Sequence, residues 1–280
     1  IVENYWQGSI DKSGNLLLNK CQENIKIKEK QTAVDPIKLE IFNSLFMSIA
    51  EQMGVALARS AYSINIKERL DFSCAVFDKD GQLIANAPHM PVHLGSMGES
   101  VRAIMQTRKN TFKDGDVFML NDPYAGGTHL PDITVVTPMF VAGDKAPAFF
   151  LASRGHHADI GGITPGSMPP NSQHIEEEGV LITDFHLVKN NKFLLDEVAS
   201  LLTDNNYPVR NLEQNLADLK AQIAANKKGI HELKAMIEQF GLATVAAYTK
   251  HIQDNAELAV REVISKLKNG NFTYAMDNGC

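Results

Sequence analysis

The sequence predicts an α+β protein in which a long N-terminal helix and a C-terminal pair of long helices flank a β-rich centre. Apolar residues recur at helical spacing over 35–62 and 210–268. Short apolar runs separated by turn residues fill 72–190 instead. Because helices and strands are segregated along the chain rather than alternating, the pattern favours this class over an α/β fold.

The first helix has a clear start signal. Asp35 is a suitable N-cap, and Pro36 suits the first helical position. Its apolar stripe repeats every four residues: Ile37, Ile41, Leu45, Ile49 and Met53. We therefore expect a helix over about 35–62.

The centre predicts short strands and one further helix. A hairpin with an Asp80-Gly81 turn is expected over 74–85, and a helix from His93 to about Arg108. Further strands are expected at 117–120, 133–136, 148–151 and 179–182. Beyond these, Gly241 divides the C-terminal helical region into two helices, which we expect to pack as an antiparallel pair.

Both ends of the sequence indicate a larger protein. Residues 1–20 predict a small hairpin, and the charged segment 20–34 is typical of a linker. The sequence begins without methionine and ends in an Asn278-Gly279 turn signal, after which a further strand is expected. We interpret it as a piece of a longer polypeptide.

The composition excludes several classes of protein. Among 280 residues, 44% are hydrophobic and 21% charged, so a disordered chain is excluded. A net charge of −6 without a dense basic patch argues against a nucleic-acid partner. Because no run of about 20 apolar residues is present, no membrane span is expected. Three cysteines without a CxxC pair and no secretory signal predict a reducing, cytoplasmic location.

Two His- and Asp-containing stretches, 121–132 and 153–162, form a candidate metal site. If 133–141 and 148–153 pair as a hairpin, Asp132 lies opposite His157, and His129 lies near Asp159. We therefore predict one divalent metal bound by His129, Asp132, Asp159 and one or both of His156 and His157. The alternative is that these are loop residues that only hydrogen-bond their neighbours.

The types of ligand restrict the metal. Imidazole and carboxylate together suit Mn, Fe, Zn or Co better than Ca or Mg, which prefer oxygen ligands alone. Such a metal can polarise a carbonyl or activate water. The sequence has no GxxxxGK[ST] or GxGxxG phosphate-binding loop, so any ATP must bind elsewhere.

Other polar residues are weaker candidates for the same site. Four of them form a second cluster that is expected to line the site: Glu68, Asp71, His89 and His93. The alternative for Glu68 and Asp71 is that they only form ion pairs with Arg69 or Lys67. Asp122 follows the strand 117–120 and is expected at the same end of the sheet. Arg154 either neutralises a substrate carboxylate or makes a surface salt bridge.

Four motifs carry a resemblance to a known family. They are Glu68-Arg-x-Asp-Phe-Ser73, Pro91-Val-His-Leu-Gly-Ser-Met97, Asn121-Asp-Pro-Tyr-x-Gly-Gly-Thr-His-Leu-Pro-Asp132 and His156-His-Ala-Asp-Ile-Gly-Gly162. From Asp35 onward the sequence resembles the hydantoinase B/oxoprolinase family, which includes B-type parts of 5-oxoprolinase, N-methylhydantoinase and acetone carboxylase. Residues 1–20 resemble the end of the companion A-type ATPase half. The resemblance thus implies an A-type tail and linker over 1–34 and a B-type domain, truncated at its C-terminus, over 35–280.

The resemblance also implies a function. An A-type half uses ATP to phosphorylate a cyclic amide, and the B-type half carries a metal, with manganese favoured, that serves ring hydrolysis or carboxylation. Metal ligands map onto His129, Asp132 and Asp159 with a further histidine nearby; whichever of His156 and His157 is not a ligand is expected to move a proton. We expect a 5-oxoprolinase that forms glutamate and is a homo-oligomer, although the fragment alone is expected to be inactive. The alternatives are an N-methylhydantoinase, an acetone-carboxylase-like enzyme, or a non-catalytic oligomer scaffold.

Overall fold

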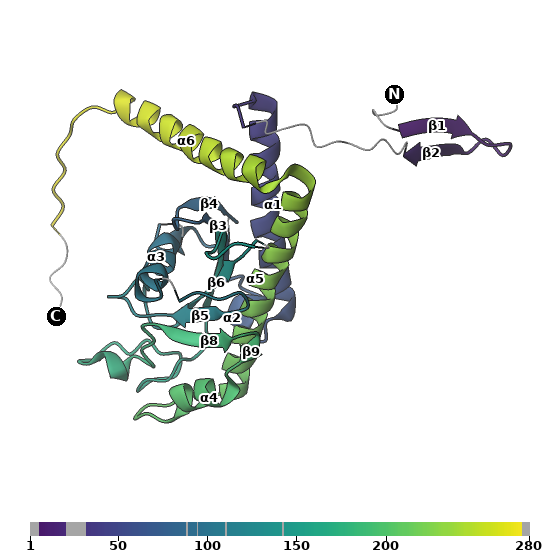
Figure 1. Cartoon of the computed structure of the whole chain (residues 1–280). Coiled ribbons are helices and arrows are strands. Elements are labelled where there is room, and N and C mark those ends of the chain that lie inside the picture. The colour runs from purple at the N-terminus through teal and green to yellow at the C-terminus, as the bar shows by residue number, and fades with distance from the viewer. Residues whose placement is uncertain are drawn as a thin grey trace.

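The computed structural model describes residues 6–20, 32–87, 89–93, 95–109, 111–141 and 143–275. Its central element is a seven-stranded antiparallel sheet with the strand order β4-β3-β7-β6-β5-β8-β9 (Figure 1). The strands are β3 (Phe72–Asp78), β4 (Leu83–Asn86), β5 (Val117–Leu120), β6 (Asp132–Met139), β7 (Phe149–His156), β8 (Phe185–Lys189) and β9 (Lys192–Phe193). Long helices before and after this sheet confirm the predicted α+β class.

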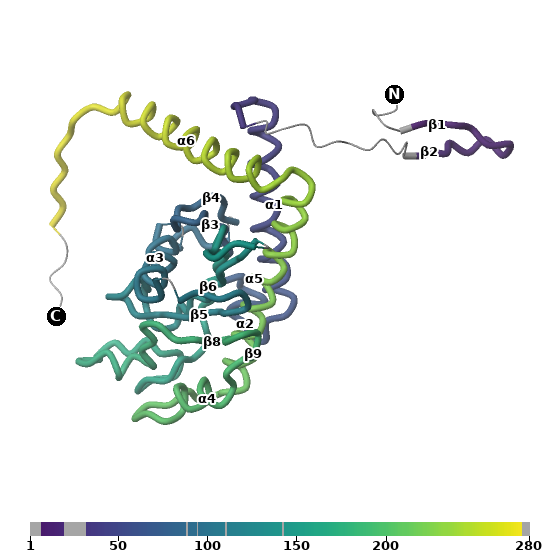
Figure 2. Tube along the Cα trace, viewed as in Figure 1, coloured from purple at the N-terminus to yellow at the C-terminus, as the bar shows by residue number. Residues whose placement is uncertain are grey.

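Helices cover both faces of the sheet. Their bounds are α1 (Pro36–Ser60), α2 (Ile64–Lys67), α3 (Met97–Thr107), α4 (Leu195–Thr203), α5 (Leu212–Phe240) and α6 (Leu242–Lys266), with short 3-10 turns η1 (Pro91–His93) and η2 (Ile175–Glu177). Helices α1 and α5 run alongside each other on one face (Figure 2). On the other face, α3 packs on Phe77, Phe118 and Phe150. The sheet is therefore the middle layer of the molecule.

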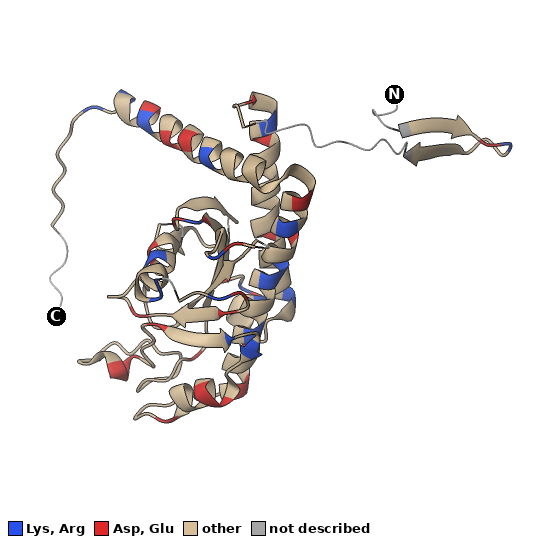
Figure 3. Ribbon diagram, viewed as in Figure 1, with Lys and Arg blue, Asp and Glu red and all other residues tan. Residues whose placement is uncertain are grey.

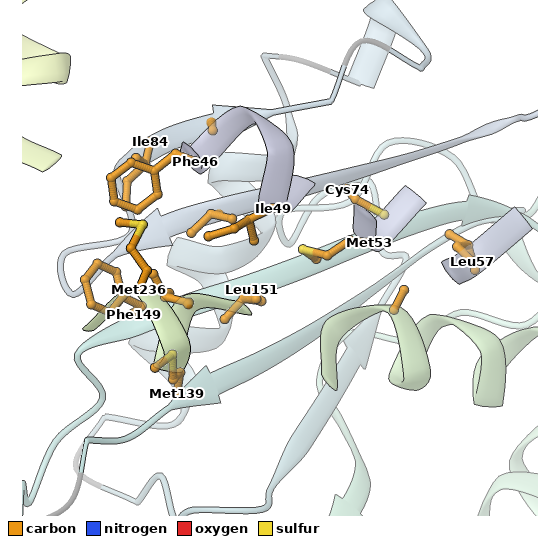
Figure 4. Close-up of a cluster of buried hydrophobic side chains, with 14 of the residues drawn as sticks. Phe46, Ile49, Met53, Leu57, Cys74, Ile84, Met139, Phe149, Leu151 and Met236 are labelled. Carbon is orange, nitrogen blue, oxygen red and sulfur yellow. The ribbon is translucent and has the colours of Figure 1, made fainter. Parts of the chain in front are cut away.

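The core on the α1 side explains the apolar stripe of the first helix. Phe46, Ile49 and Met53 of α1 cluster with Leu151 of β7 and Met236 of α5 (Figure 4). These side chains are at most 5% exposed, so each contributes about 1.5–3 kcal/mol by leaving water. The apolar pattern of α1 is therefore used to bind the sheet and α5.

Helix α1 starts where the sequence predicts. The Asp35 carboxylate accepts a hydrogen bond from the backbone N–H of Ile37 at 2.9 Å. By length and mean hydropathy (1.3), α1 is the one helix among the described residues that would suffice to cross a membrane. Seven of its residues are buried within the protein, which is how a core helix packs.

The two C-terminal helices break at Gly241 as predicted, but they do not form an antiparallel pair. Gly241 has φ +81°, a conformation that favours glycine. Helix α5 packs along α1 instead, and α6 crosses the end of α1, where Tyr248 stacks on Phe42 with ring centroids 4.4 Å apart. Figure 3 shows acidic and basic residues interspersed along the far part of α6. The expected pairing is wrong because α1 already occupies the apolar face of α5.

Two further expectations need correction. Residues 179–182 are not a strand, because Asn121 hydrogen-bonds the segment: its Nδ2 donates to the Val180 carbonyl (2.9 Å) and its Oδ1 accepts from the Ile182 N–H (2.7 Å). The helix expected from His93 starts at Met97, and His93 itself ends the turn η1. Helix α4 was not predicted from the sequence.

The N-terminal hairpin is confirmed. Strands β1 (Trp6–Ile10) and β2 (Leu16–Lys20) pair antiparallel. The linker residues 21–31 and the Asn278-Gly279 turn lie outside the described residues.

Candidate metal centre

Three of the predicted site residues meet at one end of the sheet. Asp132 opens β6, His156 ends β7, and His129 lies in the loop before β6. The Nδ1 atoms of His129 and His156 lie 3.1 and 3.2 Å from the Asp132 carboxylate oxygens. The Asp132 side chain is 4% exposed and that of His129 is 41% exposed. The group is therefore closed around Asp132 and open to solvent beside His129.

Strand register selects His156 for this group. Asp132 pairs with His156, one residue earlier than the predicted partner His157. Since successive strand residues point to opposite faces, His156 shares the face of Asp132 and His157 points to the α5 side. The predicted register is wrong by one residue, because the hairpin is centred at residue 144 rather than between 144 and 145.

His157 is a fully buried histidine against α5. Its Nε2 lies 3.1 Å from Gln222 Oε1, and its Nδ1 lies 3.2 Å from Asn215 Nδ2. Burial lowers the pKa of His157, while the nearby Asp218 carboxylate acts in the opposite direction. His157 therefore lies outside the metal group, contrary to its predicted role as a ligand or proton carrier.

Asp159 also lies outside this group. Its carboxylate forms an ion pair with Arg210 (2.7 Å) and accepts hydrogen bonds from the N–H groups of Gly161 (3.0 Å) and Gly166 (3.1 Å). The strand has already ended at His156, and the chain there turns toward the start of α5. The structure thus gives Asp159 the role of fixing a loop, which corrects the prediction that it shares an ion with Asp132.

His93 joins the group from the side of η1. Its Nε2 lies 3.2 Å from Asp132 Oδ2, and its Nδ1 lies 3.1 Å from the Ser73 hydroxyl. Either ring nitrogen of His93 can carry the hydrogen: Nε2–H would donate to Asp132, whereas with Nδ1–H donating to Ser73 the Nε2 lone pair would be free for a cation beside Asp132. The second tautomer suits a cation between His93 and Asp132, and His93 lies beside the metal group.

The ionisation of the group is set by its own contacts. Burial raises the pKa of Asp132, but hydrogen bonds from His129, His156 and His93 outweigh it and hold that pKa well below its usual range. Burial lowers the pKa of His156, whereas its hydrogen bond to Asp132 and the charge of Asp71 raise it, with a net increase. Asp132 is therefore an ionised carboxylate among imidazoles.

The loop that delivers His129 is tightly folded. Asp122 shapes it: Oδ1 accepts from the Tyr124 N–H (2.9 Å) and Oδ2 from the Thr183 hydroxyl (2.8 Å). The Gly127 N–H donates to the Asp122 carbonyl at 2.7 Å. Asp122 thus lies at the predicted end of the sheet, but its oxygens are used to build the loop.

We expect Gly127→Ala to lower both stability and metal affinity. A Cβ at residue 127 would lie 2.3 Å from the Asn121 carbonyl oxygen, so backbone would have to move. Overpacking of this kind costs about 1–3 kcal/mol, and the displaced loop carries His129. Urea unfolding and metal titration measure the two effects. Gly270→Ala, where nothing lies within 4 Å, is the control; equal behaviour of both variants would contradict the prediction.

Arg154 is not on the surface. Its side chain is completely buried, and Nε donates to Thr134 Oγ1 (2.8 Å) while Nη2 donates to Ser100 Oγ (2.8 Å). The surface salt bridge is therefore excluded. A direct contact with a substrate carboxylate would require these hydroxyls to be displaced.

Only part of the second predicted cluster lies near the metal group. The Asp71 carboxylate lies 3.9 Å from His156 Nδ1, at the rim of the group. Glu68 is exposed at the end of α2. His89 packs on the Phe72 ring, with centroids 4.4 Å apart, against Gly54 of α1. Only Asp71 and His93 of this cluster therefore lie beside the metal group.

We expect His89 to weaken the fold in acid. Burial lowers the pKa of His89, although the charge of Glu51 opposes the shift. A lowered folded-state pKa means that the unfolded chain takes up the proton first, so stability is lost as pH falls below the unfolded value of about 6.5. The stability gap between the wild type and His89→Gln should therefore narrow from pH 7.5 to pH 5 in urea unfolding. A constant gap would contradict this.

The spacing of the donors fits a metal ion. Donors about 2.1 Å from an ion lie roughly 3.0–3.4 Å from each other in tetrahedral or octahedral sites. The separations from Asp132 to its three histidine partners are 3.1–3.2 Å, and the donor atoms of His129, Asp132 and His156 all lie within 4.8 Å of one another. The set could hold a divalent metal.

Sequence reasoning missed the buried amides that support the site. Gln222 of α5 is completely buried, and its Nε2 donates to the carbonyls of Ile133 (2.9 Å) and Ser153 (3.0 Å). Asn226, one turn later, donates to the Val135 carbonyl (3.0 Å). The available signal was the helical spacing of Asn215, Asp218, Gln222 and Asn226 along one face of an otherwise apolar stripe.

Comparison with known proteins assigns a family to most of the chain. The sequence pattern of hydantoinase B/oxoprolinase matches residues 35–280. The chain belongs to this family. It is 49% identical over 277 residues to 5-oxoprolinase 1 of Arabidopsis thaliana, and the matched region covers 96% of this chain and 22% of that protein. It is 50% identical over 252 residues to 5-oxoprolinase of Dictyostelium discoideum, covering 90% and 19%. The chain thus spans about a fifth of these relatives.

Solved structures share the fold of this family member. The ATP-dependent caprolactamase of Pseudomonas jessenii superposes with a TM-score of 0.78 at 27% identity, covering 85% of this chain and 40% of that one. Nucleotide-free acetone carboxylase gives a TM-score of 0.66 at 19% identity, covering 81% and 29%. The latter similarity is one of fold alone.

Proposed function

We propose that this chain supplies the metal-dependent part of an ATP-dependent hydrolase of cyclic amides, with 5-oxoproline as substrate and glutamate as product. The observation that carries the proposal is the group of His129, Asp132 and His156. Relatives about 50% identical are 5-oxoprolinases, and a structural neighbour hydrolyses another lactam with ATP. Both support a cyclic amide as substrate.

The residues that would hold the metal are His129, Asp132 and His156, with His93 against the same carboxylate. When bound, a divalent metal supplies a Lewis acid that polarises a carbonyl or lowers the pKa of water. Imidazole and carboxylate donors favour Mn, Fe or Zn, and we propose manganese on the strength of the family resemblance.

The side chains around Asp132 leave one side of the site open to a substrate. Asp132 is closed off beneath His93, so a substrate approaches beside the exposed His129. The Thr128 hydroxyl donates to Asp132 Oδ2 at 3.2 Å and helps to orient the carboxylate. We assign Asp71 the role of accepting a proton at the rim, because its carboxylate is 26% exposed and lies 3.9 Å from His156 Nδ1.

ATP is assigned to another part of the enzyme. The sequence has no phosphate-binding loop, and the relatives are about five times longer than this chain. We propose an A-type half, in the same or a companion polypeptide, as the partner that binds ATP. A cytoplasmic location and a homo-oligomer belong to the same proposal.

The test uses the full-length protein, purified without chelator. Metal analysis is combined with ATP-dependent turnover of 5-oxoproline, hydantoin, caprolactam and, with bicarbonate, acetone. We expect stoichiometric metal and 5-oxoproline hydrolysis that is lost in His129→Ala while ATP binding persists. Preferential turnover of hydantoin or acetone would favour the N-methylhydantoinase or carboxylase alternative. Metal-free protein that is fully active would refute the proposed role of the site.

A further inference from the structure

We propose that Arg154 is a positioning residue that holds together the four chain segments from which the metal group is built. The inference rests on the proposed metal role of His129, Asp132 and His156. Arg154 itself lies on β7, two residues before His156, and its side chain is completely buried. It does not lie among the atoms that would contact the metal.

The guanidinium connects its own strand to β6 and α3. Nε donates to Thr134 Oγ1 at 2.8 Å, and Thr134 lies two residues after Asp132 on the same face of β6. Nη1 donates to Ser96 Oγ, and Nη2 donates to Ser100 Oγ at 2.8 Å. Ser96 and Ser100 mark the N-cap and first turn of α3. One planar group thus fixes three elements.

Both serines extend this connection to the remaining histidines. Ser96 Oγ donates to the His93 carbonyl at 3.2 Å, and Ser100 Oγ donates to the Gly126 carbonyl, three residues before His129. A guanidinium only donates, so each hydroxyl must accept from Arg154 and use its single hydrogen for the carbonyl. The direction of every bond is therefore fixed by Arg154, from β7 to the two loops.

The packing of the loop agrees with this arrangement. Gly126 has φ +93°, and a Cβ there would lie 2.9 Å from the Glu99 carbonyl oxygen and 2.7 Å from Ala103 Cβ. The loop that carries His129 therefore lies directly on the first turns of α3, where Ser100 receives Arg154.

The charge of Arg154 and its hydrogen bonds predict opposite effects of its removal on metal affinity. Burial lowers the pKa of Arg154 to about 10, with Asp132 acting in the opposite direction, so the side chain is cationic near neutral pH. A buried cation repels a divalent metal, and removing it would tighten metal binding if charge dominated. If positioning dominates, removal loosens the donors and weakens binding.

The experiment compares R154M and R154K in the full-length protein by titration with Mn²⁺ and by the visible absorption spectrum of the Co²⁺ form. R154M removes the charge and all donors, whereas R154K replaces the planar fork by a single ammonium group. We expect both to weaken Mn²⁺ binding at least tenfold and to alter the Co²⁺ spectrum. S100A removes the acceptor of Arg154 Nη2 and the link to the Gly126 carbonyl but leaves the bonds of Arg154 to Thr134 and Ser96, so it is expected to have a smaller effect in the same direction.

The control is L233A, in the α1–α5 core away from this site, studied at a temperature where all variants are folded. It should lower the melting temperature and leave metal affinity and spectrum unchanged. If the wild type binds metal and R154K, S100A and any folded R154M bind it as tightly or more tightly, the inference is overturned and the proposed function stands. If the wild type binds no metal, both fall.

Discussion

The variant Asp132→Asn is expected to lose metal binding and to hydrolyse substrate at least about 100-fold more slowly in the full-length protein. Asp132 is the only carboxylate in the three-residue group and touches every histidine of the site. Asp132→Asn keeps the shape of the side chain, but it removes the negative charge and presents an amide N–H₂ to one imidazole. Metal analysis and turnover measurements check the expected result.

The matched control is Asp159→Asn. Asp159 is also an aspartate and follows β7 of the same hairpin, but its oxygens are bound by Arg210 and backbone N–H groups. It should lose stability and retain metal. Added metal should also stabilise the wild type, by about 2.7 kcal/mol at 100 times the dissociation constant, and this gain should be absent in Asp132→Asn. Stoichiometric metal in Asp132→Asn would disprove our assignment of the ligands.

Replacement of Gln222 by leucine is expected to destabilise the fold by roughly 3 kcal/mol or more. Gln222 donates to the carbonyls of Ile133 and Ser153, and its Oε1 pairs with His157. Leucine would leave three buried polar atoms without these partners, and each loss costs about 1–3 kcal/mol. Urea unfolding measures the change in the free energy of unfolding.

Lys227→Leu, at an exposed position of the same helix, controls for the helix propensity and hydrophobicity of leucine. It should change stability by less than about 0.5 kcal/mol. If Gln222→Leu also lost less than 1 kcal/mol, the amide would be dispensable and water or rearranged side chains would have replaced its bonds. The prediction would then be wrong.

Local signals in the sequence predicted several of the elements correctly. The Asp35-Pro36 start of α1, the break at Gly241 and the hairpin of β6 and β7 follow from capping, backbone freedom and alternating patterns, which depend on neighbouring residues. The partner of α5 could not be predicted this way, because an apolar helical face fits α1 and α6 equally well. Tertiary packing decided between them.

For the candidate site, local sequence patterns predicted the region but not every residue that meets there. His129, Asp132 and a histidine at 156 or 157 could be predicted to lie at one end of a hairpin. Which histidine faces Asp132 depends on a single residue of register, and the turn sequence does not fix that. Asp159 was misplaced because spacing alone does not show the chain leaving the sheet toward Arg210. The roles of Gln222 and Arg154 arise from contacts distant in sequence, so no local pattern shows them.

Two neighbouring histidines at the end of β7, His156 and His157, point to opposite sides of the sheet, and this has a consequence for insertions and deletions in this region. A one-residue deletion in the 140–148 turn would exchange His156 and His157 while still offering an imidazole to each side. The same shift would replace Arg154 by Gly155 in the layer of Ser96 and Ser100, where no guanidinium would remain. Changes in the length of this turn are therefore limited by Arg154, two residues before His156. A sequence alignment that matches only the two adjacent histidines can assign the wrong one to the site.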